Sequence, residues 1–420
     1  MTSEREVYIH IQLPGTMQIV PAAVLRVLTL GDGTRLGRFR YGDRYLDRAD
    51  AVAFDPFKLP LTREVVELTA LKGVPGAVRD AAPDAWGRRV IEYRLGRAPE
   101  DFEEIDYLLN GPQDGAGCLS FGLNAQPPAP VRAWNQTHQL EQLVAVAQRI
   151  EDREPVASEL LQHLQPGTSL GGARPKATLE DARALHLAKF PLRGDRANMQ
   201  RIELATLALA ARAGIHTARA RIERVGSWDV LLLERFDRLR TQDGYHRFGM
   251  VSGLTVLDSG DSHLDRERWS YPLLADALRR WVQRPRADCA ELFRRMVFNA
   301  AVTNDDDHPR NHALIRTARG WRLSPAYDLV PSPKVSIERR DLALTVGRYG
   351  RAGSIYNLIS QSQRFGLDER EARAVIGEVI AVVRQWREVY TSSGVSPADC
   401  EAMAPAFLPE GFFYEAPPAG

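Results

Sequence analysis

Residues 303–314 read TNDDDHPRNHAL, and this stretch decides which fold the sequence predicts. Three aspartates, a histidine and an asparagine follow an apolar helical segment, so they are expected to lie in a loop. Within that loop Asp306 and Asn311 stand five positions apart. A solvated acidic turn would have the same composition, and Asp305 and Asp307 are alternatives to Asp306 for any role that needs a carboxylate.

The five-residue spacing favours Asp306 and points to phosphoryl transfer. In kinases a catalytic aspartate and a metal-binding asparagine have this spacing, because a short loop must aim a carboxylate at the acceptor hydroxyl and then offer an amide oxygen to Mg²⁺. Asp328, in SPAYDLV (residues 324–330), stands where a kinase has its second metal-binding carboxylate. The D-F-G triplet of ordinary kinases is absent, so this match is one of role and order. We predict Asp306 as the catalytic residue and Asn311 and Asp328 as the Mg²⁺ ligands.

Lys189 ends the apolar stretch LHLAK, which is expected to form a strand. A charged side chain in such a strand must be paired or contact a ligand. Glu203, near the start of the next predicted helix, is its natural partner, since kinases pair the strand lysine that holds the ATP phosphates with a helix glutamate. The alternative is a lysine that reaches solvent at the end of the strand.

Two further segments complete the predicted nucleotide site. The loop TSLGGARPK (residues 168–176) offers backbone N–H groups to phosphate and adds the charge of Lys176, although it matches neither Walker A nor G-x-G-x-x-G, and a plain turn is the alternative. The segment DVLLLERFDR (residues 229–238) stands where a kinase hinge meets adenine, and a buried strand with an exposed charged end is the alternative. His308 is expected to position its loop within this site, since no second histidine stands at zinc spacing. The predicted nucleotide contacts are Gly171, Gly172, Ala173, Arg174, Lys176, Lys189, Glu203, Glu234, Phe236, His308, Asn311 and Asp328.

Taken together, SLGGARPK, HLAKF, LLLERFDR, NDDDHPRNHALI and SPAYDLV resemble the HipA-like serine/threonine kinases, which are toxins of bacterial toxin–antitoxin modules. The resemblance covers about residues 165–335, and GVPGAVRDAAPDAWGRRVI and DFEEIDYLLNGPQDGAGCLSFG look like pieces of the family's first domain. It implies an α+β, two-lobed protein-kinase-like fold with an N-terminal α/β subdomain and a mostly helical C-terminal lobe. It also implies ATP and Mg²⁺ as cofactors.

The resemblance further implies regulation and partners. Ser169 matches the family's autophosphorylated serine, and its phosphorylation would add about −2 charge and displace the phosphate loop. The expected partners are a protein substrate, such as an aminoacyl-tRNA synthetase, and a small DNA-binding, HipB-like antitoxin through which DNA is met only indirectly. Asp307, where the family often has glycine, and Arg174-Pro175, in place of a commoner Gln-Glu pair, are departures. A catalytically weak co-repressor of this fold and a small-molecule kinase are the alternative functions.

The composition is that of a globular protein without a nucleic-acid-coating role, because 55 basic residues face 54 acidic ones among 420. The three cysteines, Cys118, Cys289 and Cys400, are too widely spaced to predict a disulfide framework or a zinc cluster, which indicates a reducing compartment. Neither a secretory signal nor an apolar run of roughly 18–20 residues is found, so a cytoplasmic protein without a membrane partner is expected.

The proline-rich segment NAQPPAP (residues 124–130) marks a boundary after the first α/β part. We expect an N-terminal subdomain at 1–125, a kinase N-lobe-like region at 136–240, a helical C-lobe at 241–403 and a tail at 404–420. A turn at Gly31-Asp32-Gly33 predicts a hairpin, and residues 369–390 predict one long helix. The tail is expected to be poorly ordered or to lie along the surface.

Overall fold

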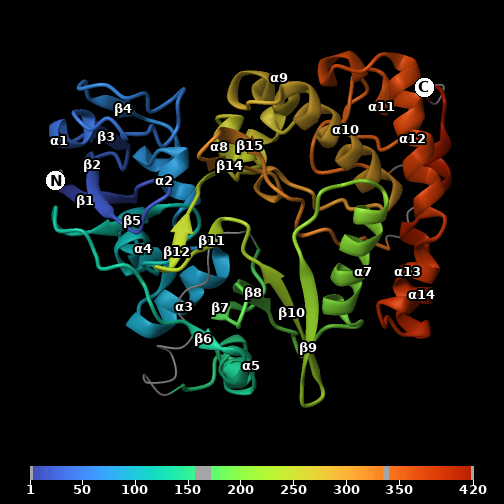
Figure 1. The fold of residues 1–420 in the computed structure, drawn as a ribbon, viewed down its shortest axis with the longest axis horizontal. Coiled ribbons are helices and arrows are strands. Elements are labelled where there is room, and N and C mark those ends of the chain that lie inside the picture. The colour runs from blue at the N-terminus through green and yellow to red at the C-terminus, as the bar shows by residue number, and fades with distance from the viewer. Residues whose placement is uncertain (1–2, 157–171, 334–339, 418–420) are drawn as a thin grey trace. The chain divides into compact units, whose positions relative to one another are not determined.

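The computed structural model of the protein describes residues 3–156, 172–333 and 340–417 (Figure 1). Its contacts divide the chain into two compact units, which we describe separately. The first unit comprises residues 1–192, 232–251 and 315–319, and the second comprises 193–231, 252–314 and 320–420. None of the helices in the described ranges is both long and apolar enough to cross a membrane.

The first unit is built mainly of strands with short helices between them. Its strands are β1 (Ser3–Gln12), β2 (Ile19–Thr29), β3 (Arg35–Tyr41), β4 (Val66–Leu68), β5 (Leu119–Gly122), β6 (Asn135–Gln136), β7 (Lys176–Glu180), β8 (Leu185–Lys189), β11 (Arg238–Arg240) and β12 (Tyr245–Arg247). Its helices are α1 (Asp43–Leu46), α2 (Gly76–Asp80), α3 (Ala85–Leu95), α4 (Glu104–Asn110) and α5 (Leu140–Glu151). Strands β10 (Trp228–Glu234), β13 (Gly249–Ser252) and β14 (Ala313–Thr317) have residues in both units.

The N-terminal sheet has the strand order β4-β3-β2-β1-β5, drawn in blue to teal in Figure 1. Strand β1 is exposed at its start and buried over Ile9–Gln12, where both of its faces are covered, and its register with β2 shifts between Ile9 and His10. The predicted hairpin is confirmed, since β2 pairs antiparallel with β3 across a turn in which Gly33 has φ +84°. Helix α3 buries Trp86, Val90 and Ile91 on one face.

A second five-stranded sheet has the order β6-β7-β8-β10-β9, with β9 at Ala220–Val225. Strands β7 and β8 are antiparallel, and their register sets Lys176 opposite Lys189. The five residues of β8 are all buried, which explains why its sequence is a continuous apolar run that ends in a single charge. The predicted nucleotide-loop lysine and the predicted phosphate lysine therefore lie on neighbouring strands.

The second unit is mostly helical. Its helices are α7 (Met199–Arg212), α8 (Gly253–Val256), α9 (Tyr271–Trp281), α10 (Pro285–Ala301), α11 (Ile355–Ile359), α12 (Glu369–Val383), α13 (Trp386–Ser392) and α14 (Pro397–Met403). Helix α10 packs against both α9 and α12, burying Phe293 and Met296 completely (Figure 1). Strands β14 and β15 (Gly320–Leu323) are neighbours in a three-stranded sheet with β13. Gly214, with φ +81°, follows α7 at the C′ position, where a left-handed backbone favours glycine.

The single long helix predicted at 369–390 is wrong, because the structure breaks it between Val383 and Trp386. The N–H of Gln385 donates to Val382 rather than one residue further back, which tightens the turn. The break turns the Trp386 ring onto Phe407, with centroids 4.1 Å apart and planes at 2°. Packing against the C-terminal segment thus accompanies the break in this helix.

The prediction of a poorly ordered or superficial tail is wrong for residues 404–412, whereas residues 413–417 are exposed, as a tail on the surface would be. Ala406 and Phe412 are fully buried there. The carbonyl of Ala406 accepts a bond from the Thr303 hydroxyl at 2.6 Å, and the N–H of Leu408 donates to Ala301 at 2.7 Å. Residues 404–412 are therefore partly built into the core of the second unit, next to the loop that follows α10.

Candidate functional site

The three aspartates in the loop after α10 differ in their exposure to solvent. Asp306 is exposed, Asp305 is half-buried, and Asp307 is only 1% exposed. Thr303, at the start of the loop, has φ +51°, a left-handed conformation that is uncommon for a β-branched residue. Of the three carboxylates, that of Asp306 is thus the most open to a substrate, in line with the residue that the spacing favours.

Backbone bonds fix the position of Asn311 relative to Asp306. The carbonyl of Asp306 accepts from the N–H of His308 at 2.8 Å and from Nδ2 of Asn311 at 3.2 Å. The N–H of Asn311 donates to the carbonyl of His308 at 2.9 Å. The Oδ1 atom of Asn311 is buried and has no hydrogen-bond partner among the residues that the structure describes. A buried amide oxygen without a donor is costly unless a ligand meets it.

Asp328 belongs to a segment that is tied to this loop. The Tyr327 hydroxyl donates to the carbonyl of Arg310 at 2.6 Å, and the N–H of Ser324 donates to Ala313 at 2.8 Å. Asp328 itself has φ +58°, a conformation that costs a non-glycine residue free energy and that often marks functional sites. The segment after the β14–β15 hairpin is therefore held beside the residues that precede β14.

The pKa of Asp306 is raised from its usual value. The partial removal of its carboxyl group from water is the largest cause, although the residue as a whole is exposed; the carboxylates of Asp328, Asp305 and Asp307 add to it, and His308 opposes it. Asp306 and Asp328 are thus close enough for their charges to interact. A site with this excess of negative charge favours a bound cation.

The residues Asn311 and Asp328 fit Mg²⁺ by the chemistry of their donors. Mg²⁺ takes oxygen ligands and usually keeps several waters, so one carboxylate and one amide oxygen are a sufficient protein contribution. No group of three or more His, Cys, Asp or Glu side chains suited to a metal is found within the described ranges. The unpartnered Oδ1 of Asn311 is the observation that supports the fit.

Asp307 is part of a buried network that sequence reasoning missed. Its carboxylate accepts from the Tyr271 hydroxyl, and its Oδ2 lies 2.9 Å from Nε2 of His312. Nδ2 of Asn299 donates to the Tyr271 oxygen at 3.0 Å. Burial and then the neighbouring carboxylate raise the pKa of Tyr271 well above its usual value, so its hydroxyl stays protonated and donates. The third aspartate of the loop is a structural acceptor.

In the first unit the two predicted lysines are both buried. Nζ of Lys176 lies 2.7 Å from Oδ2 of Asp84 and 2.8 Å from the carbonyl of Gly172. Asp84 also caps α3 by accepting from the N–H of Gly87. Like charges opposite one another on neighbouring strands are unfavourable, and the carboxylate of Asp84 offsets the charge of Lys176. The expected phosphate contact of Lys176 stays a prediction, and its observed partners tie the end of the phosphate loop to α3.

At the end of β10, successive side chains alternate between a half-buried face and a buried face. Glu234 and Phe236 are half-buried, whereas Arg235 and Asp237 are buried almost completely. The N–H of Arg235 donates to the carbonyl of Leu185 in β8 at 2.8 Å. Glu234 and Phe236, the two residues predicted to meet adenine, thus lie on one face of an extended segment. Arg235 and Asp237 lie on its opposite, buried face.

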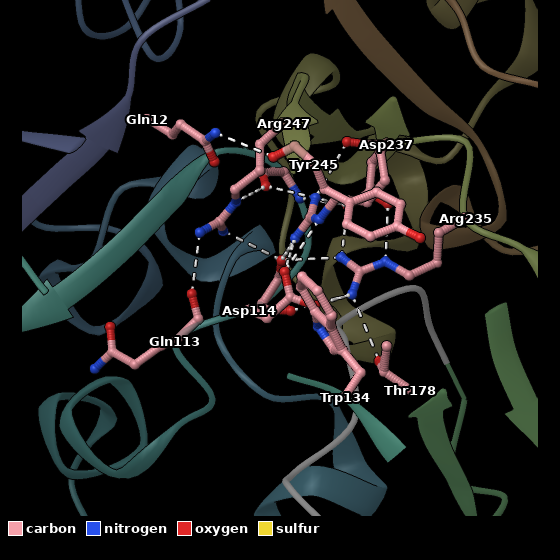
Figure 2. Close-up of polar contacts among 12 residues, drawn as sticks. Gln12, Gln113, Asp114, Trp134, Thr178, Arg235, Asp237, Tyr245 and Arg247 are labelled. Carbon is pink, nitrogen blue, oxygen red and sulfur yellow. Dashed lines mark hydrogen bonds and ion pairs between the residues drawn. The ribbon is translucent and has the colours of Figure 1, made fainter. Parts of the chain in front are cut away.

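Figure 2 shows the ion pairs and hydrogen bonds that hold Arg235 and Asp237 in place. Nη1 of Arg235 meets Oδ2 of Asp114 at 2.8 Å, its Nη2 meets Asp237 at 2.9 Å, and Nη2 of Arg238 meets Oδ1 of Asp114 at 2.7 Å. Arg247 bonds carbonyls of the same loop, including Gly115 and Gly117. Burial would raise the pKa of Asp114, but the neighbouring arginines outweigh it and lower that pKa. The network ties the end of β10 to the loop before β5.

The remaining predicted residues fall into three groups. Gly171 and Ser169 lie outside the described residues. Gly172, Ala173 and Arg174 stand just before β7, and Glu203 is buried in α7 of the second unit. The structure brings Asp306, His308, Asn311 and Asp328 together within the second unit. The expected pairing of Lys189 with Glu203 stays a prediction, as do the nucleotide contacts of the first unit.

Several residues that build these sites were missed by the sequence analysis. They are Asp84, Asp114, Arg235, Asp237, Arg238, Tyr271 and His312. One signal was present, because the alternation in ERFDR assigns Arg235 and Asp237 to the face opposite Glu234 and Phe236. Their partners lie more than a hundred positions away, and no local pattern identifies them.

Comparisons with known proteins identify the family and the fold. The profile of the family described as "HipA-like C-terminal domain" matches residues 168–386, just over half of the chain. A protein of Sinorhizobium fredii named "Putative kinase Y4mE" is 25% identical over 351 residues, which cover 77% of this chain and 81% of that protein. A chain in the Shewanella oneidensis MR-1 complex of HipA, HipB and operator DNA matches with a TM-score of 0.60 at 16% identity, covering 95% of this chain and 94% of that one. The predicted α+β, kinase-like fold of the HipA type is confirmed.

Proposed function

The chain belongs to the HipA-like C-terminal domain family of kinase-like proteins, and on this premise we propose that it is an ATP- and Mg²⁺-dependent protein serine/threonine kinase. The observation that carries the proposal is the arrangement of three side chains in the second unit. Asp306 is exposed and has a raised pKa, Asn311 has a buried amide oxygen without a partner in the described chain, and Asp328 acts electrostatically on Asp306.

The proposed chemistry assigns one task to each residue. Asp306 orients the hydroxyl of the acceptor serine or threonine and accepts its proton, while the hydroxyl oxygen bonds to the γ-phosphorus and ADP leaves. A raised pKa makes the carboxylate a better proton acceptor. Asn311 and Asp328 would hold Mg²⁺, which supplies positive charge to the phosphate oxygens. Catalysis then rests on positioning and electrostatic stabilisation.

Most of the proposed nucleotide contacts belong to the first unit, and Glu203 belongs to the second. In this proposal Lys189 contacts the ATP phosphates, and Glu203 pairs with it as in other kinases. The backbone near Glu234 and Phe236 meets adenine. Residues 171–176 cover the phosphates, with Lys176 fastening the end of that loop through Asp84.

Regulation and partners belong to the same proposal. Phosphorylation of Ser169 would place negative charge next to the phosphate loop and displace it. A small DNA-binding antitoxin would bind the protein and link it to operator DNA, as the Shewanella oneidensis complex joins HipA, HipB and DNA. The substrate would be a cytoplasmic protein of translation, with an aminoacyl-tRNA synthetase as the first to try.

The experiment is incubation with γ-labelled ATP and Mg²⁺, first alone and then with cell extract, comparing the wild type with Asp306→Ala. We expect label on Ser169 in the first mixture and on a protein band in the second, and no label with the variant. Ser169→Ala separates self-modification from transfer to another protein, because it should lose only the first signal. Equal labelling by Asp306→Ala would overturn the assignment.

The second candidate function is a co-repressor with little or no transferase activity. The match to a chain from a toxin–antitoxin–DNA complex favours it. In that case the wild type binds ATP without transferring label, and binding to antitoxin and operator DNA is its measurable activity. Label that appears only in small molecules of the extract would instead indicate a small-molecule kinase.

A further inference from the structure

We infer that Tyr271, Asp307 and His312 form a buried clamp that positions Asp306 and Asn311 for metal binding and phosphoryl transfer. The inference rests on the proposed kinase function and adds positioning residues to it. All three clamp side chains are buried in the second unit, so they cannot touch a substrate themselves. They act by holding Asp306 and Asn311 in position.

The clamp follows from a simple offset in the sequence. Asp307 directly follows Asp306, and His312 directly follows Asn311, so the functional pair and the structural pair have the same five-residue spacing. Oδ2 of Asp307 and Nε2 of His312 are 2.9 Å apart. This bond closes the loop from its buried side, while Nδ2 of Asn311 closes it through the Asp306 carbonyl at 3.2 Å. The two closures together fix where the Asn311 amide oxygen points.

Rigid elements hold the clamp in place. Tyr271 is the first residue of α9, and its hydroxyl donates to Asp307. Asn299, in the last turn of α10, donates to the Tyr271 oxygen at 3.0 Å and accepts from Nδ2 of Asn304 at 3.1 Å. Because helices hold side chains more accurately than loops do, this chain of bonds transmits the geometry of α9 and α10 to the loop.

The far end of the loop is fastened in the same unit. The carbonyl of His312 accepts from the N–H of Gly253 at 2.7 Å. A Cβ atom at Gly253 would lie 2.6 Å from the carbonyl oxygen of Pro309, so α8 approaches the loop as closely as a glycine permits. The rings of Tyr271 and His312 also meet edge to face, with centroids 5.4 Å apart. Loss of the Tyr271 hydroxyl would therefore loosen the inner side of the loop without removing its packing.

The test uses Tyr271→Phe with Tyr390→Phe as its matched control. Both tyrosines are fully buried in the second unit, and the Tyr390 hydroxyl lies 2.7 Å from that of Thr206 in α7. The readouts are Mn²⁺ binding in the presence of a non-hydrolysable ATP analogue, followed by electron paramagnetic resonance, and steady-state kcat and KM for ATP. His312→Gln, which retains a side-chain N–H, is compared with His312→Phe, which does not.

We expect Tyr271→Phe to weaken Mn²⁺ binding and to lower kcat by a factor on the order of 10–100, with KM for ATP little changed. Tyr390→Phe should leave both readouts as in the wild type, and His312→Gln should retain more activity than His312→Phe. If Tyr271→Phe binds Mn²⁺ and turns over like the wild type, the clamp is overturned. If the wild type itself neither binds Mn²⁺ with the nucleotide nor transfers phosphate, the proposed function fails instead.

Discussion

The guanidinium of Arg235 and the carboxylate of Asp114 meet at 2.8 Å, although 121 positions separate them in the sequence (Figure 2). Both side chains are buried, and each also bonds a further member of the same network, Asp237 or Arg238. Buried charges of this kind are costly unless every one is matched. The segment ERFDR is thus fastened to the loop before β5 by its arginines and its aspartate.

Asp114→Asn should destabilise the protein strongly, because it leaves the charges of Arg235 and Arg238 buried with one carboxylate fewer. The expected loss in free energy of unfolding is about 3–5 kcal/mol. It is measured by urea unfolding, in which the midpoint should shift to a lower urea concentration. Asp50→Asn is the control, since its ion pair with Arg48 is on the surface and should contribute little. Equal midpoints for the two variants would show that the network does not stabilise the fold.

His10 should make stability depend on pH in the weakly acidic range. The side chain is fully buried, and neither ring nitrogen has a hydrogen-bond partner in the described part of the chain. It lies opposite Ser120 in the β1–β5 register. Burial lowers the pKa of His10 from 6.5 to about 4. The unfolded chain therefore takes up a proton before the folded protein does, and stability falls as the pH drops from about 6.5 to about 4.

The expected loss across this window is roughly 3 kcal/mol in free energy of unfolding. It is measured by urea unfolding at several pH values, with His10→Leu removing this part of the dependence and the exposed His138→Leu leaving it intact. Glu104 adds a further loss of stability as the pH falls from about 4.5 to about 2. Burial would raise its pKa, but bonds from Arg88 and the charge of Lys72 lower it to about 2. A His10→Leu protein with the wild-type pH dependence between 6.5 and 4 would contradict the assignment.

Removal of residues 404–420 should lower both stability and phosphoryl transfer. The deletion removes the stacking of Phe407 on Trp386, the buried Phe412 and the bond from Thr303 at the start of the catalytic loop. Loss of buried aromatic side chains costs several kcal/mol, on the order of 3–5 for each phenylalanine. Thermal unfolding and transfer of label from ATP measure the two effects.

A shorter deletion, of residues 416–420, is the control for this experiment. It leaves Phe407 and Phe412 in place, so the unfolding temperature and the rate of transfer should match the wild type. If the long deletion behaves in the same way as the short one, the tail does not support the catalytic loop.

The parts of the site that the sequence predicts are the local ones. Asp306 and Asn311 belong to a single loop, so their spacing alone carries their geometry, and the turn at Gly33 likewise depends on neighbouring residues. The sequence also favours Asp306 among three aspartates. The different exposure of the aspartates agrees with that choice. Asp307 is buried and accepts a hydrogen bond from Tyr271, whereas Asp306 is exposed.

The features that the sequence does not predict depend on distant partners. Nothing near Lys176 shows that Asp84 holds its amine, and nothing near Trp386 shows that Phe407 stacks on it. The apolar periodicity of residues 369–390 continues across the break between α12 and α13, so a local analysis extends the helix. Tertiary packing decides these positions, and propensity is a weaker influence.

The central claim is that Asp306 performs phosphoryl transfer at a site where Asn311 and Asp328 hold Mg²⁺. Its most direct test is a single-turnover measurement with Asp306→Asn, in which bound γ-labelled ATP is followed as it loses its label. We predict transfer slower than in the wild type by on the order of 100-fold or more, with unchanged affinity for a non-hydrolysable ATP analogue. Transfer by Asp306→Asn at the wild-type rate would contradict the account.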